Sequence, residues 1–283
     1  MRESVASTAR FRGARIALLE ARMSDEMEAL IRRFGGIPYS VPAVREERLD
    51  NREQVAAFID ALDSARVDTV IFLTGAGVTA LLLEAERLQR KQEMLEKLRR
   101  LWVVCRGPKP AAVLRSCAVP ITLNASEPYT TQALLAALQE LDLRGSGVAV
   151  VHYGERSEML VKVLRANGAR FVEELLLYAW RLPPDTTGLE KLVQEIIGGC
   201  VEAVVFTSQI QVRHLWQIAG ELKLSDELSR ALQARTIVAS IGPTCTAVLE
   251  SYGVRPRVVP AHPKMGHLVK TLVEYMDSLS HGT

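Results

Sequence analysis

The sequence predicts an α/β protein built from two similar doubly wound parallel-sheet domains, joined by a two-stranded linker, with a cleft between them. Three observations support this fold class. A chain of 283 residues is long enough for two domains of about 120–140 residues, each with its own core. Short apolar runs alternate with helix-like segments, which is typical of a parallel sheet covered by helices on both faces. Segments of the first half also recur in the second half, which indicates internal duplication.

The repeat is clearest in two stretches, Asp68–Leu81 (DTVIFLTGAGVTAL) and Glu202–Leu215 (EAVVFTSQIQVRHL). Each contains an acid, an apolar run that ends in Phe, a polar corner and the start of a helix. The two Phe residues, Phe72 and Phe206, are 134 positions apart (206 − 72). Each half is therefore expected to carry the same strand, corner and helix.

Two further pairs of segments have nearly the same offset. Ile16 and Val148 each lie in an apolar run, 132 positions apart (148 − 16). Gly107 and Gly242 lie in the related stretches CRGPKPAAVL and SIGPTCTAVL, 135 positions apart (242 − 107). Three segments at a nearly constant offset favour a tandem duplication.

The chain opens with a predicted βαβ unit. An apolar strand over 15–19 precedes a helix for which Ser24 is the expected N-cap and Gly35–Gly36 the stop, and a second strand follows over 37–41. The apolar face of this helix is formed by Met23, Met27, Leu30, Ile31 and Phe34.

The second half repeats this opening. A strand over 148–151 precedes a helix over about 157–166, which stops at Asn167–Gly168, and a strand over 171–178 follows. The other predicted helices are 54–62, 83–98, 131–141, 189–197, 225–232 and 266–279.

Proline and polar residues near 42–47 and 180–187 mark two crossings between the domains. We therefore expect one discontinuous domain of residues 1–41 plus 179–283 and a second domain of residues 47–173. Residues 42–46 and 174–178 are the expected linker strands. Because only two short crossings join the domains, we also expect the angle between them to change when the cleft closes.

Composition excludes several classes of protein. Apolar residues make up 48% and charged residues 24%, and the net charge is only +2, so nothing global favours nucleic acid or an anionic membrane as a partner. No apolar run approaches the roughly 18 residues of a membrane helix, and the first twelve residues are expected to form a loose tail. Four Cys and five His lack metal-ligand spacing. Cys245 is expected to be a packed apolar side chain rather than a nucleophile.

The candidate binding residues lie at predicted strand-to-helix corners. In parallel sheets these corners meet at the carboxyl edge, where ligands bind. Backbone N–H groups at helix N-termini, hydroxyls and cations together suit a polyanion. For each residue alone, a helix cap or a solvated charge is the alternative. The candidates are Arg22, Thr74, Gly75, Arg106, Lys109, Thr207, Ser208, Gln209, Gly242, Pro243 and Thr244.

Four features together resemble the uroporphyrinogen-III synthase family over nearly the whole chain after the tail. They are Arg22 after the first strand, the F-T-S-x-x-x-V corner over Phe206–Val212, Tyr178 before a proline-containing linker, and I-G-P-T-x-x-A-x-L over Ile241–Leu249. The resemblance implies two α/β domains, with the N-terminal piece returning to the C-terminal domain.

The resemblance also implies an activity. It is the cyclisation of the linear tetrapyrrole hydroxymethylbilane, with inversion of ring D and loss of water, in heme biosynthesis. No metal or organic cofactor is implied. Tyr178 would be the catalytic residue that assists departure of the hydroxyl group. Thr244 and the corner at Thr207–Gln209 would bind the acetate and propionate groups. We expect a cytoplasmic monomer that acts on this small polycarboxylate and on neither nucleic acid nor membrane.

A physical argument agrees with this function. Hydroxymethylbilane can close without an enzyme to the wrong isomer, so the protein has to hold one folded conformation and stabilise charge rather than supply a strong base. Gln209, Pro110 and Arg106 depart from residues expected at those corners of the family. A catalytically inactive homologue that senses a tetrapyrrole or another polyanion is therefore the alternative. A nucleotide or sugar-phosphate binder is a third, opposed by the missing Gly-rich phosphate loop.

Overall fold

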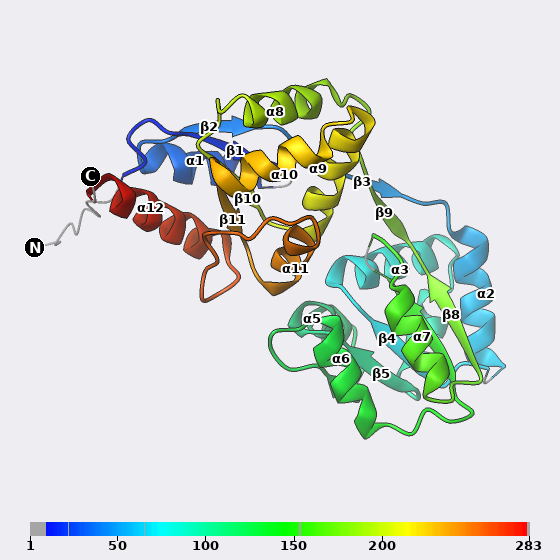
Figure 1. Cartoon of the computed structure of the whole chain (residues 1–283). Coiled ribbons are helices and arrows are strands. Elements are labelled where there is room, and N and C mark those ends of the chain that lie inside the picture. The colour runs from blue at the N-terminus through cyan, green and yellow to red at the C-terminus, as the bar shows by residue number, and fades with distance from the viewer. Residues whose placement is uncertain (1–9, 22, 65, 153, 282–283) are drawn as a thin grey trace, which may run out of the picture. The chain divides into compact units, whose positions relative to one another are not determined.

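The computed structural model describes residues 10–21, 23–64, 66–152 and 154–281. It divides into two compact units (Figure 1). Unit 1 takes the chain up to Arg45 and again from Arg181 onward, and unit 2 takes Glu46–Trp180. Each unit contains a parallel sheet with helices on both faces, which confirms the predicted fold class. None of the described helices is both long and apolar enough to cross a membrane.

Unit 1 has a four-stranded parallel sheet in the order β11-β10-β1-β2. The strands are β1 (Arg15–Leu18), β2 (Ile37–Ser40), β10 (Ala203–Phe206) and β11 (Ile237–Ser240). The helices are α1 (Ser24–Arg33), α8 (Thr187–Ile197), α9 (Gln209–Glu221), α10 (Ser225–Ala234), α11 (Pro243–Ser251) and α12 (Met265–His281).

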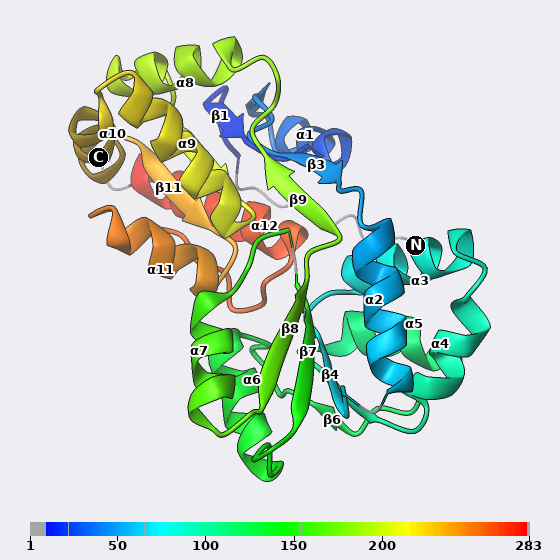
Figure 2. The same cartoon turned by 90° about the vertical axis from the view of Figure 1, so that its right-hand side faces the viewer.

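Alternating strand residues of unit 1 supply two cores, one on each face of the sheet. Ala17 and Phe206 pack with apolar residues of α8, α9, α10 and α11, whereas Ile16 and Val205 pack with those of α1 and α12. Figure 2 shows these helices around the sheet. This alternation follows from the two-residue period of a strand. Strands buried on both faces are almost wholly apolar, which is why they appeared as apolar runs in the sequence.

Unit 2 has a five-stranded parallel sheet in the order β6-β5-β4-β7-β8. The strands are β4 (Thr69–Phe72), β5 (Trp102–Cys105), β6 (Leu123–Asn124), β7 (Gly147–Val151) and β8 (Phe171–Leu175). The helical segments are α2 (Arg52–Asp63), α3 (Gly75–Arg87), α4 (Lys91–Leu98), α5 (Pro108–Ser116), α6 (Thr131–Ala137), the 3₁₀ turn η1 (Leu138–Glu140) and α7 (Glu158–Ala166).

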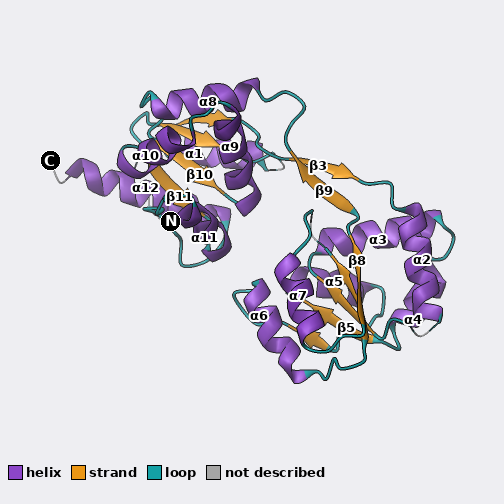
Figure 3. Ribbon diagram, turned by 45° about the vertical axis from the view of Figure 1, so that its right-hand side comes forward, coloured by secondary structure: helices purple, strands orange, loops and turns teal. Residues whose placement is uncertain are grey.

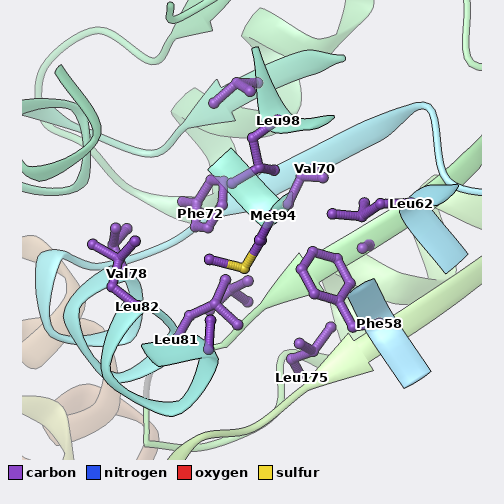
Figure 4. Close-up of a cluster of buried hydrophobic side chains, with 14 of the residues drawn as sticks. Phe58, Leu62, Val70, Phe72, Val78, Leu81, Leu82, Met94, Leu98 and Leu175 are labelled. Atoms are coloured by element: carbon purple, nitrogen blue, oxygen red, sulfur yellow. The ribbon is translucent and has the colours of Figure 1, made fainter. Parts of the chain in front are cut away.

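The larger core of unit 2 joins β4 to α2, α3 and α4. Phe58, Phe72 and Met94 are fully buried there, and Figure 4 shows their side chains in one cluster. Ile71 points to the opposite core, where residues of α6 and α7 cover the other face of the sheet. Both faces of the sheet are thus covered, and its edge at the carboxyl ends of the strands carries the polar corners.

The two sheets correspond strand for strand. The order β11-β10-β1-β2 of unit 1 matches β5-β4-β7-β8 of unit 2, which has β6 as an additional edge strand. The pairs are those expected from the sequence offsets, with β1 matching β7 and β10 matching β4. The internal repeat of the sequence is therefore also a repeat of topology.

The linker strands lie later in the chain than predicted. The separate two-stranded sheet is formed by β3 (Arg45–Arg48) and β9 (Tyr178–Arg181) (Figure 3). The predicted strands were residues 42–46 and 174–178. The single strand expected over 171–178 is divided into β8 and β9. The physical reason is the length of the partner strand, because β8 pairs with β7 only as far as the pair Leu175–Val151. Tyr178 therefore begins a strand instead of ending one.

Two helix predictions also differ from the structure. The helix expected over 83–98 is two helices, because α3 ends at Arg87 and Gln89 has a left-handed backbone with φ +59° before α4 begins. Ser24 is the first residue of α1 rather than its N-cap, since Met23 occupies the cap position and makes no side-chain cap hydrogen bond.

Candidate functional site

All but one of the described candidate site residues lie at the carboxyl edges of the two larger sheets, where strands lead into helices. In unit 1 these are Thr207, Ser208, Gln209, Gly242, Pro243 and Thr244, and in unit 2 they are Thr74, Gly75, Arg106 and Lys109. Tyr178 is the exception, because it begins β9 of the two-stranded sheet. Arg22 lies outside the described residues.

Unit 2 brings Thr74 and Tyr178 together. Thr74 is the N-cap of α3, and its Oγ1 accepts a hydrogen bond from the Gly77 backbone N–H at 3.0 Å. The same oxygen lies 3.0 Å from the Tyr178 hydroxyl oxygen. Tyr178 is 2% exposed, so its phenol is held in a fixed position rather than moving in solvent. Because Thr74 is β-branched and its Oγ1 makes two polar contacts, its side chain is held in one conformation, and it fixes the position of the Tyr178 hydroxyl group.

Trp180 supports Tyr178 from the side. The two rings meet edge to face with their centroids 5.3 Å apart. The Trp180 backbone N–H donates to the Gly154 carbonyl oxygen at 3.0 Å. Gly154 has φ +61°, and a Cβ atom added there would lie 1.9 Å from the indole ring. Only glycine fits this position, because it lets the backbone approach the indole closely.

The neighbouring corner of unit 2 supplies positive charge. The Arg106 backbone N–H donates to the Phe72 carbonyl oxygen at 3.0 Å, which joins the β5 corner to β4. A Cβ atom on Gly75 would lie 3.2 Å from the Lys109 carbonyl oxygen, so these two corners are close together. Pro108 and Pro110 lack backbone N–H groups at the start of α5. Anion binding at this corner therefore depends on the side chains of Arg106 and Lys109.

The β10 corner of unit 1 contains two residues that the sequence analysis did not select, Glu20 and Gln211. Gln211 Oε1 accepts from the backbone N–H groups of Thr207 at 2.8 Å and Ser208 at 3.3 Å. Gln211 Nε2 donates to Thr207 Oγ1 at 2.8 Å, and the Thr207 hydroxyl donates to Glu20 Oε2. Gln211 is only 3% exposed. The corner is thus an ordered hydrogen-bond network that ends on a carboxylate.

A sequence signal for Gln211 did exist. Ser208 and Gln211 form the S-x-x-Q pattern of a capping box, and the structure has this capping box at the start of α9. Glu20 gives a weaker signal, because it is simply the first polar residue after the apolar run of β1. Its contact with Thr207 depends on β1 and β10 being neighbours in the sheet.

His152 is a further polar residue at the carboxyl edge of unit 2 that sequence reasoning did not select. It follows β7 and is 0% exposed. Its Nδ1 accepts from the Ser157 backbone N–H at 3.3 Å, and its Nε2 lies 2.9 Å from Glu174 Oε2, which Arg156 also approaches at 3.3 Å. Burial lowers the pKa of His152, although Glu174 opposes this effect. The imidazole is therefore neutral at pH 7, with its proton on Nε2 facing Glu174.

The β11 corner of unit 1 is built by Gly242 and Pro243. Gly242 is the N-cap of α11, Pro243 is the first residue of that helix, and Thr244 is exposed beside them. Cys245 is 2% exposed, and burial raises its pKa to about 11. It is a packed thiol and not an activated nucleophile. Among the described residues, no group of three or more His, Cys, Asp or Glu side chains could hold a metal ion.

Comparison with known proteins places the chain among others of this architecture. The family model described as uroporphyrinogen-III synthase HemD matches residues 25–270. A Bacillus subtilis (strain 168) protein of uncharacterised function, YjjA, is 31% identical over 94% of this chain and 97% of its own length. A Methanothermobacter thermautotrophicus protein provisionally named a uroporphyrinogen-III synthase is 32% identical over 82% of this chain and 86% of its own.

A solved structure shares the fold. The crystal structure of a mutant uroporphyrinogen III synthase from the extremely thermophilic bacterium Thermus thermophilus superimposes with a TM-score of 0.77. The match covers 95% of this chain and 100% of that one, at 24% sequence identity.

Proposed function

Because the chain belongs to the uroporphyrinogen-III synthase family, we propose that it cyclises hydroxymethylbilane, with inversion of ring D and loss of water. The observation that carries this proposal is the hydrogen bond between Tyr178 and Thr74 in unit 2. The reaction needs one positioned proton donor and several carboxylate-binding groups. The Tyr178 phenol and the side chains of Arg106 and Lys109, all in unit 2, support the proposal because they are groups of these kinds.

Thr74 gives the Tyr178 phenol a defined role. Its Oγ1 already accepts from the Gly77 N–H, so its own proton can be donated to the Tyr178 oxygen. The phenol proton is the one that we propose is transferred to the hydroxyl group of the substrate. As that proton is transferred, the developing phenolate is stabilised by the Thr74 donor.

The proposed steps balance in atoms and electrons. Tyr178 protonates the terminal hydroxyl group, the C–O bond breaks with its electrons on oxygen, and water leaves an azafulvenium cation. The substituted carbon of ring D attacks this cation to form a spiro intermediate, which fragments and recloses at the other carbon of ring D. The proton that ring D loses on becoming aromatic again restores the phenol.

In unit 2, Arg106 and Lys109 are proposed to bind substrate carboxylates. In unit 1, the helix N-terminus at Gly242–Thr244 is a candidate anion site of its own. Guanidinium and ammonium groups neutralise carboxylates without taking part in proton transfer. Local rather than global positive charge is enough for one small polyanion. This agrees with a chain whose net charge is only +2.

A coupled assay tests the proposal. Hydroxymethylbilane is generated enzymatically in place, the protein is added, the products are oxidised, and the type I and type III porphyrins are separated. Predominant type III porphyrin is the expected result. Type I porphyrin alone, formed at the spontaneous rate by protein with an intact circular dichroism spectrum, rejects the synthase.

A second candidate is a homologue that binds a tetrapyrrole without converting it. The β10 corner favours this alternative, because the backbone N–H groups of Thr207 and Ser208 already donate to Gln211 instead of facing a ligand. The assay separates the two functions when it is combined with a binding measurement on methylbilane, the substrate analogue without the reactive hydroxyl group. Binding without type III product supports the alternative.

A further inference from the structure

An exposed aromatic ring lies at the carboxyl edge of unit 2. Three of the described aromatic residues have exposed side chains, namely Trp102, Tyr129 and Tyr252. Trp102 begins β5, at the opposite edge of the sheet, and Tyr252 is stacked on Trp216. Tyr129 lies between β6 and α6, and no aromatic ring or cation of the described chain packs on it. The open part of its ring is therefore accessible to a ligand.

The backbone holds Tyr129 in a conformation that is costly for a bulky residue. Its φ is +58°, in the left-handed region, and its N–H donates to the Ser126 carbonyl oxygen at 2.9 Å. Its ring lies against Gly107, the N-cap of α5, because a Cβ atom added to that glycine would lie 3.2 Å from Tyr129 Cγ. The hydroxyl at its tip makes only a long hydrogen bond, of 3.5 Å, to Glu127 Oε1. The turn thus presents the ring beside the start of α5 at a cost in backbone energy.

The corresponding place in unit 1 shows that packing alone does not require this ring. Gly242, the N-cap of α11, is covered in the same way by Pro263, whose Cβ atom would lie 3.4 Å from an added Cβ. Tyr129 and Pro263 are 134 positions apart (263 − 129), and each lies two residues before the next helix. Proline fixes φ at about −65°, so unit 1 covers its glycine without a left-handed residue. The larger ring and the strained backbone of Tyr129 are therefore features of unit 2 that the duplicated fold does not need.

Positive charge lies at the same corner. Lys109 is two residues beyond Gly107, in the first turn of α5, and its side chain is exposed. None of the described residues forms an ion pair with it. The same turn approaches the start of α3, because a Cβ atom on Gly75 would lie 3.2 Å from the Lys109 carbonyl oxygen. An aromatic surface and an ammonium group thus occur at one corner, and both belong to unit 2.

We propose that Tyr129 binds the substrate by stacking on one of its pyrrole rings, while Lys109 pairs with a carboxylate of that ring. This inference rests on the proposed function. Each pyrrole ring of hydroxymethylbilane is a flat π-system that carries carboxylate side chains, so an aromatic surface beside an ammonium group matches both of its parts. The stack forms in the ground state as in the transition state. It therefore contributes to substrate binding rather than to the chemical step.

Tyr129→Asn tests this role, because asparagine adopts the left-handed backbone at lower cost than tyrosine and has no ring. We expect the dissociation constant of methylbilane and the KM for hydroxymethylbilane to rise about 10-fold, while kcat changes less than about threefold. Tyr129→Phe keeps the ring and should bind methylbilane within about twofold of wild type. In urea unfolding, Tyr129→Asn should be at least as stable as the wild type, which a ring needed for packing would not allow.

Trp102→Thr is the matched control in the same sheet. Trp102 is 43% exposed, against 36% for Tyr129, but it lies at the amino end of β5. Threonine suits a strand, so the substitution removes an exposed ring and keeps the fold. Methylbilane binding should remain within about twofold of wild type. Equal losses in Trp102→Thr and Tyr129→Asn overturn the stacking role, because the effect would then not depend on the corner.

The outcomes separate this inference from the function on which it rests. Wild-type protein that forms type III porphyrin, with Tyr129→Asn binding methylbilane as tightly as the wild type, overturns the role of Tyr129 alone. Weaker binding by Tyr129→Asn together with a lower urea midpoint also overturns it, because the ring would then serve the fold. Wild-type protein that neither binds methylbilane nor forms type III porphyrin overturns both. Weaker binding by stably folded Tyr129→Asn, in a protein without turnover, supports the stack within the binding alternative.

Discussion

Units 1 and 2 share one topology, but corresponding positions in their sheets carry side chains of different chemical type. β1 leads to Glu20 and its counterpart β7 leads to His152, two residues that are 132 positions apart (152 − 20), as their strands are. Glu20 contacts the corner of β10, the neighbouring strand on one side. His152 instead contacts Glu174 of β8, the neighbouring strand on the other side.

The helix caps differ in the same way. Thr74 caps α3 with its own hydroxyl and still contacts the phenol of Tyr178. In unit 1 the capping box of Ser208 and Gln211 closes the corner, and Thr207 contacts a carboxylate. In unit 2 the corner hydroxyl of Thr74 thus contacts a phenol, whereas in unit 1 the corner hydroxyl of Thr207 contacts a carboxylate. The difference teaches that the shared backbone places polar groups at the carboxyl edge of each sheet, while single side chains decide which polar contacts form there.

The strongest test of the contrast is Tyr178→Phe, which removes the phenol from unit 2 and keeps the ring that packs on Trp180. We expect kcat for type III formation to fall about 100-fold, because the leaving hydroxyl group loses its positioned proton donor. KM should change little, since the carboxylate-binding residues remain. The measurement is the coupled assay at several hydroxymethylbilane concentrations.

Tyr252→Phe is the matched control in unit 1. Tyr252 also packs on a tryptophan, stacked on Trp216 at 4.6 Å between ring centroids. Its kcat should remain within about twofold of wild type. Equal losses in the two variants would show that ring packing, and not the proton of Tyr178, is responsible.

The next largest effect is expected from Gly154, which lies against Trp180, the residue that packs on Tyr178. Gly154→Ala would place a Cβ atom 1.9 Å from the Trp180 ring, at a residue with φ +61°. We expect the free energy of unfolding to fall by about 2–4 kcal/mol, from steric overlap and backbone strain together. Gly253→Ala in unit 1 has only the strain of φ +78°, with no atom within 4 Å of the added Cβ, and should cost about 1 kcal/mol.

Urea unfolding of both glycine variants measures this difference, and the coupled assay shows whether the displaced Trp180 also lowers kcat. If Gly154→Ala is no less stable than Gly253→Ala, the close approach of Gly154 to the indole does not contribute to the free energy of unfolding. The proposed support of the phenol by Trp180 would then lose its basis.

The smallest effect expected is on the pH dependence of stability. Burial holds the pKa of His152 below its ordinary value of 6.5, so the unfolded chain binds more protons than the folded chain below that pH. The contribution of His152 to stability is therefore present above about pH 6.5 and is lost as the pH falls toward 5. His152→Gln, which does not titrate, should show a shallower decline over this range in urea unfolding.

The neighbours of His152 set the control for this test. Glu174 faces Nε2 and Arg156 faces Glu174, and both charges remain in His152→Gln. Identical slopes for wild type and His152→Gln between pH 7 and 5 would contradict a neutral buried imidazole in unit 2.

The sequence determined the fold class and the edge at which the polar residues lie. Apolar runs of four or five residues that alternate with helix-like segments are typical of strands buried on both faces, and the near-constant offset between repeats predicted two related sheets. Thr74, Lys109, Thr207 and Thr244 could be assigned to strand-to-helix corners from the sequence because such corners are local features with local signals. The capping box of Ser208 and Gln211 belongs to the same class, although its signal was overlooked.

Tertiary structure alone decided which of these groups meet. Thr74 and Tyr178 are 104 residues apart, and Thr207 and Glu20 are 187 apart. Their contacts depend on the order of strands in each sheet, which no local pattern encodes. The end of β8 was likewise set by the length of its partner β7 rather than by its own residues. Local composition specifies elements because each element satisfies its own backbone and buries its own face, whereas contacts between distant residues arise only after those elements pack.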